Sequence, residues 1–346
     1  MQPDSVSLEY TVEQLVKLCE IPSPSGYTQA VQQYLVDELT SLGYAPVRTN
    51  KGSVMCDIGG EGNGLALAAH VDTLGAMVRS IKANGRLRMT MIGGFPGNYI
   101  ETENVTIHTR DGKTFSGTVQ ISDPSTHVNS KAGEAKRDDK GLDIVLDEKV
   151  KCKKDVEKLG IGTGDFVSFA PRTVVTKSGF IKSRHLDDKA SAAILLALAR
   201  WAKKPGISLP RKVWLLFTTY EEVGHGGSAG IPHGITEMIS VDMGCVGDDL
   251  TADETMVSIC AKDSAGPYDF DVTNALVDVA RRLELQYALD IYPHYGSDVD
   301  ATLRAGYDIR HGLLGPGVFA SHGYERTHRE GLENTLKLLA AYALQR

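Results

Sequence analysis

The feature that most restricts the fold of this chain is a change in sequence pattern between residues 75 and 174. Before and after this stretch, apolar runs such as GLALAAHVDT alternate with amphipathic helical patterns, which is typical of a sheet covered by helices. Inside it, short alternating runs are separated by Gly, Asp, Asn and Lys, and helical periodicity is confined to KKDVEKLG. The sequence therefore predicts an α/β/α sandwich formed by residues 1–74 and 175–346, with a small all-β, barrel-like unit of residues 75–174 inserted into it.

Several helices and strands of the outer part can be placed individually. Apolar residues at helical spacing predict two helices within residues 11–42, on either side of the turn IPSPSG. Further helices are predicted over DDKASAAILLALARWAKK, NALVDVARRLEL and GLENTLKLLAAYALQR, and strands over KVWLLFTTYEE and within ITEMISVDMG.

Composition restricts the partners and the compartment. The 346 residues carry a net charge of −7, which disfavours nucleic acid or an anionic membrane as a partner. No apolar stretch reaches the roughly 18 residues of a membrane span, and the N-terminus lacks the basic patch and apolar core of a signal peptide. The five cysteines are scattered and form no CxxC pair, as expected for reduced thiols. We expect a cytoplasmic protein.

Histidines and carboxylates follow the predicted strands at the points where they end. Functional groups in α/β sheets gather at the carboxyl ends of strands. These positions hold His70 and Asp72, Asp187 and Asp188 before the long helix, Glu221 and Glu222, Asp242, and His322. Each residue alone has an ordinary explanation, such as a helix N-cap for the Asp pair or solvated side chains for the Glu pair. Their joint occurrence indicates a metal site.

The mixture of imidazole and carboxylate suits divalent metal ions. Zn²⁺ accepts these ligands with one position open, and Co²⁺, Mn²⁺ and Ni²⁺ accept them too. Two ions close together would need a bridging carboxylate and would offset the crowding of negative charge. A water shared by two ions is deprotonated near neutral pH, and a carboxylate that is not a ligand can take the proton. This reasoning explains the adjacent Glu221 and Glu222: one binds metal and the other is the base.

The order of these motifs resembles the dinuclear metal aminopeptidases of the glutamyl aminopeptidase family, which include the tetrahedral (TET) aminopeptidases. The resemblance rests on His70-x-Asp72, LDDK at 186–189, EEVG at 221–224, Asp242 and His322. The segments GIGTGDFVSF, GSDVDA and ENTLKLL also resemble the family, so the similarity extends over essentially the whole chain.

The resemblance implies a role for each residue of the set. It makes Asp187 the ligand that bridges two divalent ions, with Zn²⁺ favoured, and Glu221 the general base. It pairs Asp242 with the metal of His70, Glu222 with the metal of His322, and has Asp72 orient the ring of His70. It also implies that the insert mediates dimer contacts and that dimers assemble into hollow dodecamers that admit short peptides only.

Two positions depart from the family pattern, and one further residue has two interpretations. Thr73 stands where the family usually has Glu, and Lys189 stands where it usually has Arg. Neither is expected to bind metal, but both could alter substrate preference. Asp298 in GSDVDA is a candidate for holding the ammonium group of a substrate, with a helix N-cap as the alternative.

These observations favour a metal-dependent aminopeptidase that removes N-terminal residues from short peptides. A dinuclear carboxypeptidase or N-acyl amino-acid deacylase is the alternative enzyme, because such enzymes also use a His-x-Asp motif. The position of the insert directly after the first motif favours the aminopeptidase. A non-catalytic oligomeric scaffold is the alternative outside enzymes, and the complete set of ligands argues against it.

Overall fold

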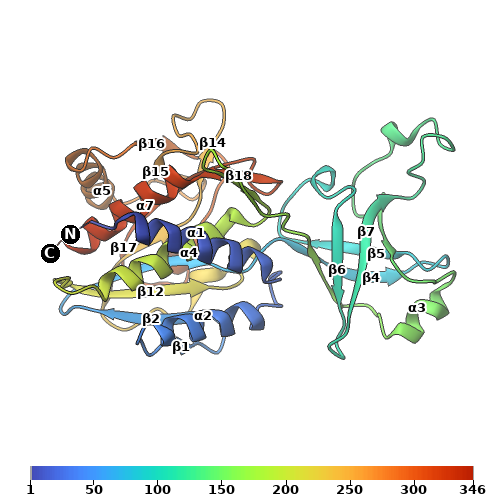
Figure 1. Ribbon diagram of the computed structural model, residues 1–346, viewed down its shortest axis with the longest axis horizontal. Coiled ribbons are helices and arrows are strands. Elements are labelled where there is room, and N and C mark those ends of the chain that lie inside the picture. The colour runs from blue at the N-terminus through green and yellow to red at the C-terminus, as the bar shows by residue number, and fades with distance from the viewer. Residues whose placement is uncertain (1, 346) are drawn as a thin grey trace.

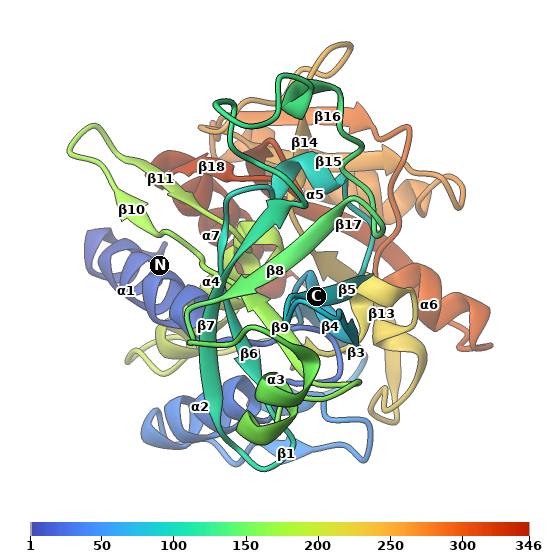
Figure 2. The same cartoon turned by 90° about the vertical axis from the view of Figure 1, so that its right-hand side faces the viewer.

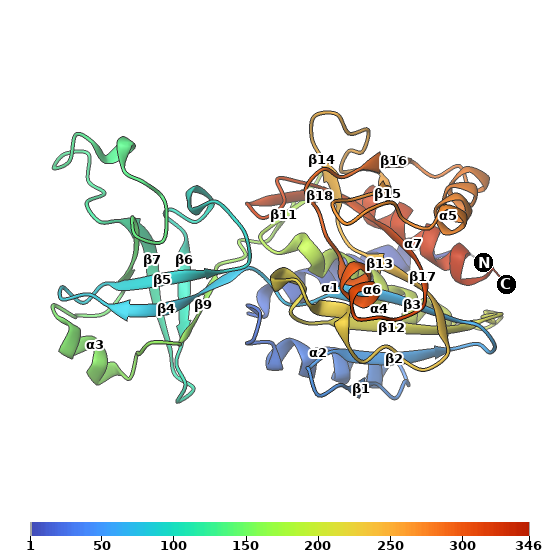
Figure 3. The ribbon, with the colours of Figure 1, turned by 180° about the vertical axis from the view of Figure 1, so that it is seen from behind.

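The computed structural model describes residues 2–345 and shows two bodies of different architecture (Figure 1, Figure 3). The larger body is a mixed α/β sandwich built from both ends of the chain. The smaller body is a closed β-barrel at one end of the molecule. Within the described residues, all five cysteines are free and no helix is long and apolar enough to cross a membrane.

The larger body is built on a 12-stranded sheet. At its centre β2, β12, β3, β13 and β17 lie side by side, and the last four run parallel. The strands of this sheet are β1 (Val47–Arg48), β2 (Val54–Gly59), β3 (Gly64–His70), β10 (Val174–Val175), β11 (Phe180–Ser183), β12 (Lys212–Thr218), β13 (Ile235–Val241), β14 (Gly244–Val246), β15 (Val257–Lys262), β16 (Tyr287–Ile291), β17 (Arg310–Phe319) and β18 (Glu325–His328).

Helices cover both faces of this sheet. One face carries α1 (Ser5–Glu20), α2 (Gln29–Ser41), α4 (Leu186–Ala202), α5 (Phe270–Arg282) and α7 (Arg329–Ala343), and the other carries α6 (Asp298–Arg304) (Figure 3). Strand β3 is buried along its whole length, with Leu65 and Leu67 packed toward the first face and Ala66 and Ala68 toward the second. This arrangement confirms the predicted α/β/α class and the helices and strands predicted for the outer part.

The insert forms the barrel, as predicted (Figure 2). Its antiparallel strands close in the order β4-β5-β8-β7-β6-β9 around an apolar core of their own. They are β4 (Gly75–Ile81), β5 (Leu87–Ile92), β6 (Asn104–His108), β7 (Thr114–Ile121), β8 (Leu142–Leu146) and β9 (Phe166–Phe169), and the short helix α3 (Lys153–Leu159) coincides with KKDVEKLG. The predicted boundary at residue 174 falls inside β10, which pairs with β11 of the larger sheet. The domain boundaries and the dimerisation role of the insert stay predictions.

Candidate metal centre

The histidines and carboxylates singled out from the sequence meet at one edge of the large sheet. Strand β3 ends at His70, and β12 ends three residues before Glu221. Asp242 directly follows β13, and His322 lies in the turn after β17. Helix α4 starts at the same edge and supplies Asp187 near its N-terminus. The carboxyl ends of parallel strands thus gather groups that are far apart in the sequence.

Asp187 lies between the two histidines. Its Oδ1 is 3.0 Å from Nε2 of His70, and its Oδ2 is 3.3 Å from Nε2 of His322. Glu222 Oε2 lies 3.6 Å from the same nitrogen of His322, and Glu221 Oε2 lies 3.7 Å from Nε2 of His70. Each oxygen of one carboxylate therefore faces a different imidazole, which is the arrangement that a ligand bridging two ions requires.

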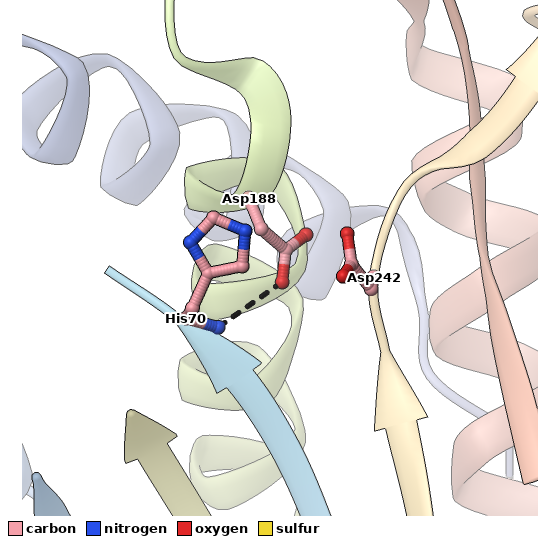
Figure 4. A group of neighbouring side chains, drawn as sticks. All are labelled: His70, Asp188 and Asp242. Carbon is pink, nitrogen blue, oxygen red and sulfur yellow. Dashed lines mark hydrogen bonds between the residues drawn. The ribbon is translucent and has the colours of Figure 1, made fainter. Parts of the chain in front are cut away.

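A second group, which shares His70, adds a carboxylate that sequence reasoning left without a role. One ligand atom each from His70, Asp188 and Asp242 lie within 4.8 Å of one another (Figure 4). Asp188 Oδ2 accepts a hydrogen bond from the backbone N–H of His70 at 3.2 Å, whereas Oδ1 is buried without a protein partner. A buried carboxylate oxygen without a donor is costly unless a cation compensates it. The donor set and this oxygen both fit a divalent metal site.

Asp72 contacts the site in two ways. Nδ1 of His70 lies 2.9 Å from the backbone carbonyl oxygen of Asp72 and 3.7 Å from its carboxylate. The carboxylate accepts hydrogen bonds from the hydroxyl of Ser25 and from the backbone N–H of Glu221, the latter at 3.1 Å. The backbone carbonyl of Asp72 is thus nearer to the ring than its carboxylate is. The carboxylate holds the start of the segment that carries Glu221.

Three residues at the site have a left-handed backbone, which is uncommon for residues other than glycine. Tyr220 (φ 69°) directly precedes Glu221, His185 (φ 68°) caps α4, and His322 (φ 65°) is itself a member of the cluster. The peptide bond between Asp187 and Asp188 is cis. Left-handed conformations of residues other than glycine gather at functional sites, where the surrounding structure holds them in place.

Glu325 is a further residue that the sequence did not reveal. Its Oε2 accepts a hydrogen bond from the backbone N–H of Asp187 at 3.1 Å, and its Oε1 accepts one from that of His322 at 2.9 Å. Gly94, in the loop after β5 of the barrel, offers its carbonyl 2.6 Å from Nδ1 of His322. No pattern in the sequence marks these contacts, because they join segments that only the tertiary fold brings together.

The carboxylates of the cluster have strongly shifted acidities. Burial raises the pKa of Glu221 and of Glu222 well above the usual value, and neighbouring carboxylates add to the rise. Burial, together with the charge of Asp187, raises the pKa of Asp242 to about 7. Burial and the charge of Asp187 likewise raise the pKa of Glu325 to about 8. The raised pKa values mean that these carboxylates bind protons readily. A bound cation would supply the same compensating positive charge.

The histidines shift in the opposite sense to what burial alone would cause. Burial would lower the pKa of His322, but its hydrogen bond to Asp187 and the charge of Glu222 raise it to about 10. Burial would also lower the pKa of His70, and the contact with Asp187 raises it well above the usual value. Both imidazoles thus respond to an excess of negative charge at the centre.

The cluster opens into a cavity of about 840 Å³. Asp187, Glu221, Glu222, Asp242 and His322 line it, and so do Gly94, Pro96 and Tyr99 of the insert, His294 and Arg304. The insert therefore contributes one wall of the candidate site.

Thr73, Lys189 and Asp298, which the sequence singled out outside the proposed ligand set, do not line this cavity. Thr73 lines a separate small cavity at the foot of the barrel, and Lys189 is buried with its Nζ donating to the carbonyl of Ile21 at 2.7 Å. Asp298 contacts the end of β12 before Glu221, where its Oδ2 accepts a hydrogen bond from the hydroxyl of Thr218 at 2.5 Å. The N-cap of α6 is Ser297, so the N-cap interpretation of Asp298 is wrong, and its contact with a substrate stays a prediction.

The chain is similar to known peptidases along most of its length. The pattern of the M42 glutamyl aminopeptidase family matches residues 52–338. The protein YhfE of Bacillus subtilis (strain 168) is 48% identical over 338 residues, which cover 97% of this chain and 98% of YhfE. The glutamyl aminopeptidase of Lactococcus lactis subsp. cremoris (strain MG1363) is 26% identical over 215 residues, which cover 61% of this chain and 59% of that protein.

Solved structures show the same fold. The aminopeptidase APDkam598 of Desulfurococcus kamchatkensis superposes with a TM-score of 0.86 at 22% identity, covering 98% of this chain and 96% of that one. The TET1 peptidase of Pyrococcus horikoshii superposes with a TM-score of 0.85 at 22% identity, covering 97% and 100%. The latter is described as assembling into a tetrahedron or a large octahedral shell.

Proposed function

Because this chain belongs to the M42 glutamyl aminopeptidase family and is therefore a peptidase, we propose that it removes N-terminal residues from short peptides with the help of two divalent metal ions and Glu221 as general base. The observation that carries the proposal is the position of Asp187, whose two oxygens face His70 and His322 with Glu221 and Glu222 on either side.

We assign five residues to the metals: His70, Asp187, Glu222, Asp242 and His322. Asp187 is shared, Asp242 belongs with His70, and Glu222 belongs with His322, as their distances suggest. When bound, such ions supply a water that is deprotonated near neutral pH and a Lewis acid that polarises the peptide carbonyl. Zn²⁺ suits this donor set, and Co²⁺, Mn²⁺ and Ni²⁺ also accept it.

Glu221 is assigned the transfer of protons. Its side chain is 16% exposed and lines the cavity, and it is not needed to complete the ligand set. Its raised pKa suits a group that takes a proton from a water and passes it to the departing amine. Asp72 supports this role, because it contacts Nδ1 of His70 and also holds the backbone N–H of Glu221.

The cavity and the relatives support proposals about the substrate and the oligomeric state. A cavity of about 840 Å³ with a wall from the insert suits a short peptide. The TET1 peptidases of known structure form dodecamers and larger shells, and we propose that this chain also forms dimers through its insert and a dodecamer from them. Five free cysteines suit a reducing compartment, and we propose the cytoplasm.

Release of free amino acids from matched free and N-acetylated peptides tests the reaction. We expect release only from the free peptides, and only after a divalent metal is returned to metal-stripped protein. Release from the acetylated peptides would instead indicate a deacylase. A metal-loaded protein that acts on neither set would support the scaffold.

Glu221→Gln tests the base. We expect metal content to stay at the wild-type level and kcat to fall by about 10²- to 10⁴-fold, the usual contribution of a general base. Glu61→Gln, an exposed residue between β2 and β3, is the matched control. Full activity in Glu221→Gln would refute the base assignment, and loss of metal would make Glu221 a ligand.

A further inference from the structure

The segment that carries Glu221 contains no β-strand and no α-helix that would fix its position. Strand β12 ends at Thr218, and the following residues form two short 3-10 turns, η3 (Glu221–Val223) and η4 (Gly226–Ser228), separated by the left-handed Gly224 (φ 86°). A segment without strand or helix partners is held by side chains from elsewhere, or it moves. The relevant question is therefore which side chains hold it.

Lys51 holds the far end of the segment. It lies between β1 and β2, 174 residues away from His225 in the sequence. Its Nζ donates to the carbonyl of His225, to the carbonyl of Gly226 at 2.7 Å and to the hydroxyl of Ser228 at 3.1 Å. A lysine ammonium has three N–H donors, so all of them are used on this one segment.

Helix α6 also contacts this segment. Asp298 Oδ2 accepts a hydrogen bond from Thr218, and Oδ1 lies so close to Gly226 that a Cβ on this glycine would be 2.0 Å from it. The hydroxyl of Thr302 donates to the carbonyl of Gly227 at 2.7 Å. A Cβ on Gly227 would lie 2.5 Å from the backbone oxygen of Asp298. The helix and the segment are thus in contact at a distance that only glycine allows.

We propose that Lys51 and Asp298 are positioning residues that clamp the segment of Glu221 and so fix its carboxylate relative to the reacting water. The inference rests on the proposed function, in which Glu221 is the base. Asp72 holds the N–H of Glu221 at the start of the segment, and Lys51 and α6 hold its end. Neither Lys51 nor Asp298 lines the cavity, so direct contact with a substrate does not explain their placement.

The lysine can be tested with matched variants. Lys51→Met should lower kcat by about 10- to 100-fold, because a misplacement of about 1 Å costs a catalytic group this much. KM and metal content should stay at wild-type values. Lys51→Arg should recover most of the loss, because a guanidinium also donates to several acceptors. Lys212→Met is the control, since Lys212 is also half-buried but pairs with Asp57 at the other end of β12.

A double variant separates positioning from other roles. If Lys51 acts only through Glu221, Lys51→Met should change the residual rate of Glu221→Gln by less than about twofold. A further 10- to 100-fold loss in that background, or a normal kcat in Lys51→Met alone, would overturn the clamp. If Lys51→Met does not fold, Asp298→Asn can replace it, because asparagine is nearly the same size as aspartate. Its effect on the rate is then compared in the wild-type and Glu221→Gln backgrounds in the same way. Full activity of Glu221→Gln itself would refute the proposed function instead, so the two failures are distinguishable.

Discussion

Glu325→Gln tests whether one buried carboxylate holds two proposed metal ligands in place. Both carboxylate oxygens of Glu325 accept backbone N–H groups, at 3.1 Å from Asp187 and 2.9 Å from His322. Glutamine keeps the size of the side chain but has a single acceptor oxygen. One of the two N–H groups then faces an amide NH₂ and loses its partner, in a place where Glu325 is only 2% exposed.

The size of the effect follows from that lost bond. A buried donor left without a partner costs about 1–3 kcal/mol, and every 1.4 kcal/mol is about tenfold in an equilibrium constant. We therefore expect the metal dissociation constant to rise by about 5- to 150-fold. The cost should appear mainly in metal binding, because the metal-free segments can shift to regain a partner, whereas bound metal holds Asp187 and His322 where they are.

Competition with a chromophoric chelator measures this change directly, and thermal unfolding of the metal-free protein measures the remaining loss of stability. Glu254→Gln is the matched control. Glu254 is also buried and pairs with Arg326, the residue next to Glu325 on β18, but it contacts no proposed ligand. Unchanged metal affinity in Glu325→Gln, or an equal loss in the control, would refute the reasoning.

Three further predictions concern close packing, cavity charge and metal. Gly226→Ala should lower kcat by about 100-fold, because the new Cβ would lie 2.0 Å from Asp298 Oδ1. Gly247→Ala is the control and should keep the wild-type kcat, because there is open space around Gly247. Equal kcat values in the two variants would contradict this reasoning. Arg304 lines the cavity and carries a positive charge outside the proposed metal site, so acidic N-terminal residues should be favoured over Lys. Arg304→Glu should shift that kcat/KM ratio toward Lys by about 2- to 5-fold, since this arginine is 68% exposed; an unmoved ratio would show that Arg304 does not contact substrate. Removing metal should lower the free energy of unfolding by about 2.7 kcal/mol for each bound ion, when the free metal concentration beforehand is about 100 times the dissociation constant. A melting temperature independent of metal would argue against a metal site.

Much of the site could be predicted because the sequence marks where strands end. Strand β3 is an uninterrupted buried run, and the apolar residues of β12 stop just before the two glutamates. Since parallel strands share one carboxyl edge, finding the ends was enough to group His70, Glu221 and Asp242. The switch from helical to alternating periodicity located the barrel in the same way.

The contacts that hold the site were not predictable in this way. Lys51 meets Gly226 across 175 positions, and Glu325 meets Asp187 across 138. These pairs depend on how segments far apart in the sequence fold together at the sheet edge. Local hydrophobic periodicity does not predict such contacts. Asp298 illustrates the same limit: its segment was placed near the site, but the contacts of its side chain with Thr218 and Gly226 required the structure.

The supporting contacts share one feature: each joins a charged side chain to the backbone of the candidate site. Asp72 and Glu325 accept backbone N–H groups, and Lys51 donates to backbone carbonyls, so charged side chains fix the main chain of the segments that carry the proposed ligands and the proposed base. The functional side chains are then free to turn toward the ions and the substrate. Because these supports are buried or half-buried and joined to rigid elements, the geometry is set before any cation arrives. We therefore expect the proposed metal ions to cause little conformational change on binding and to relieve the repulsion among the carboxylates.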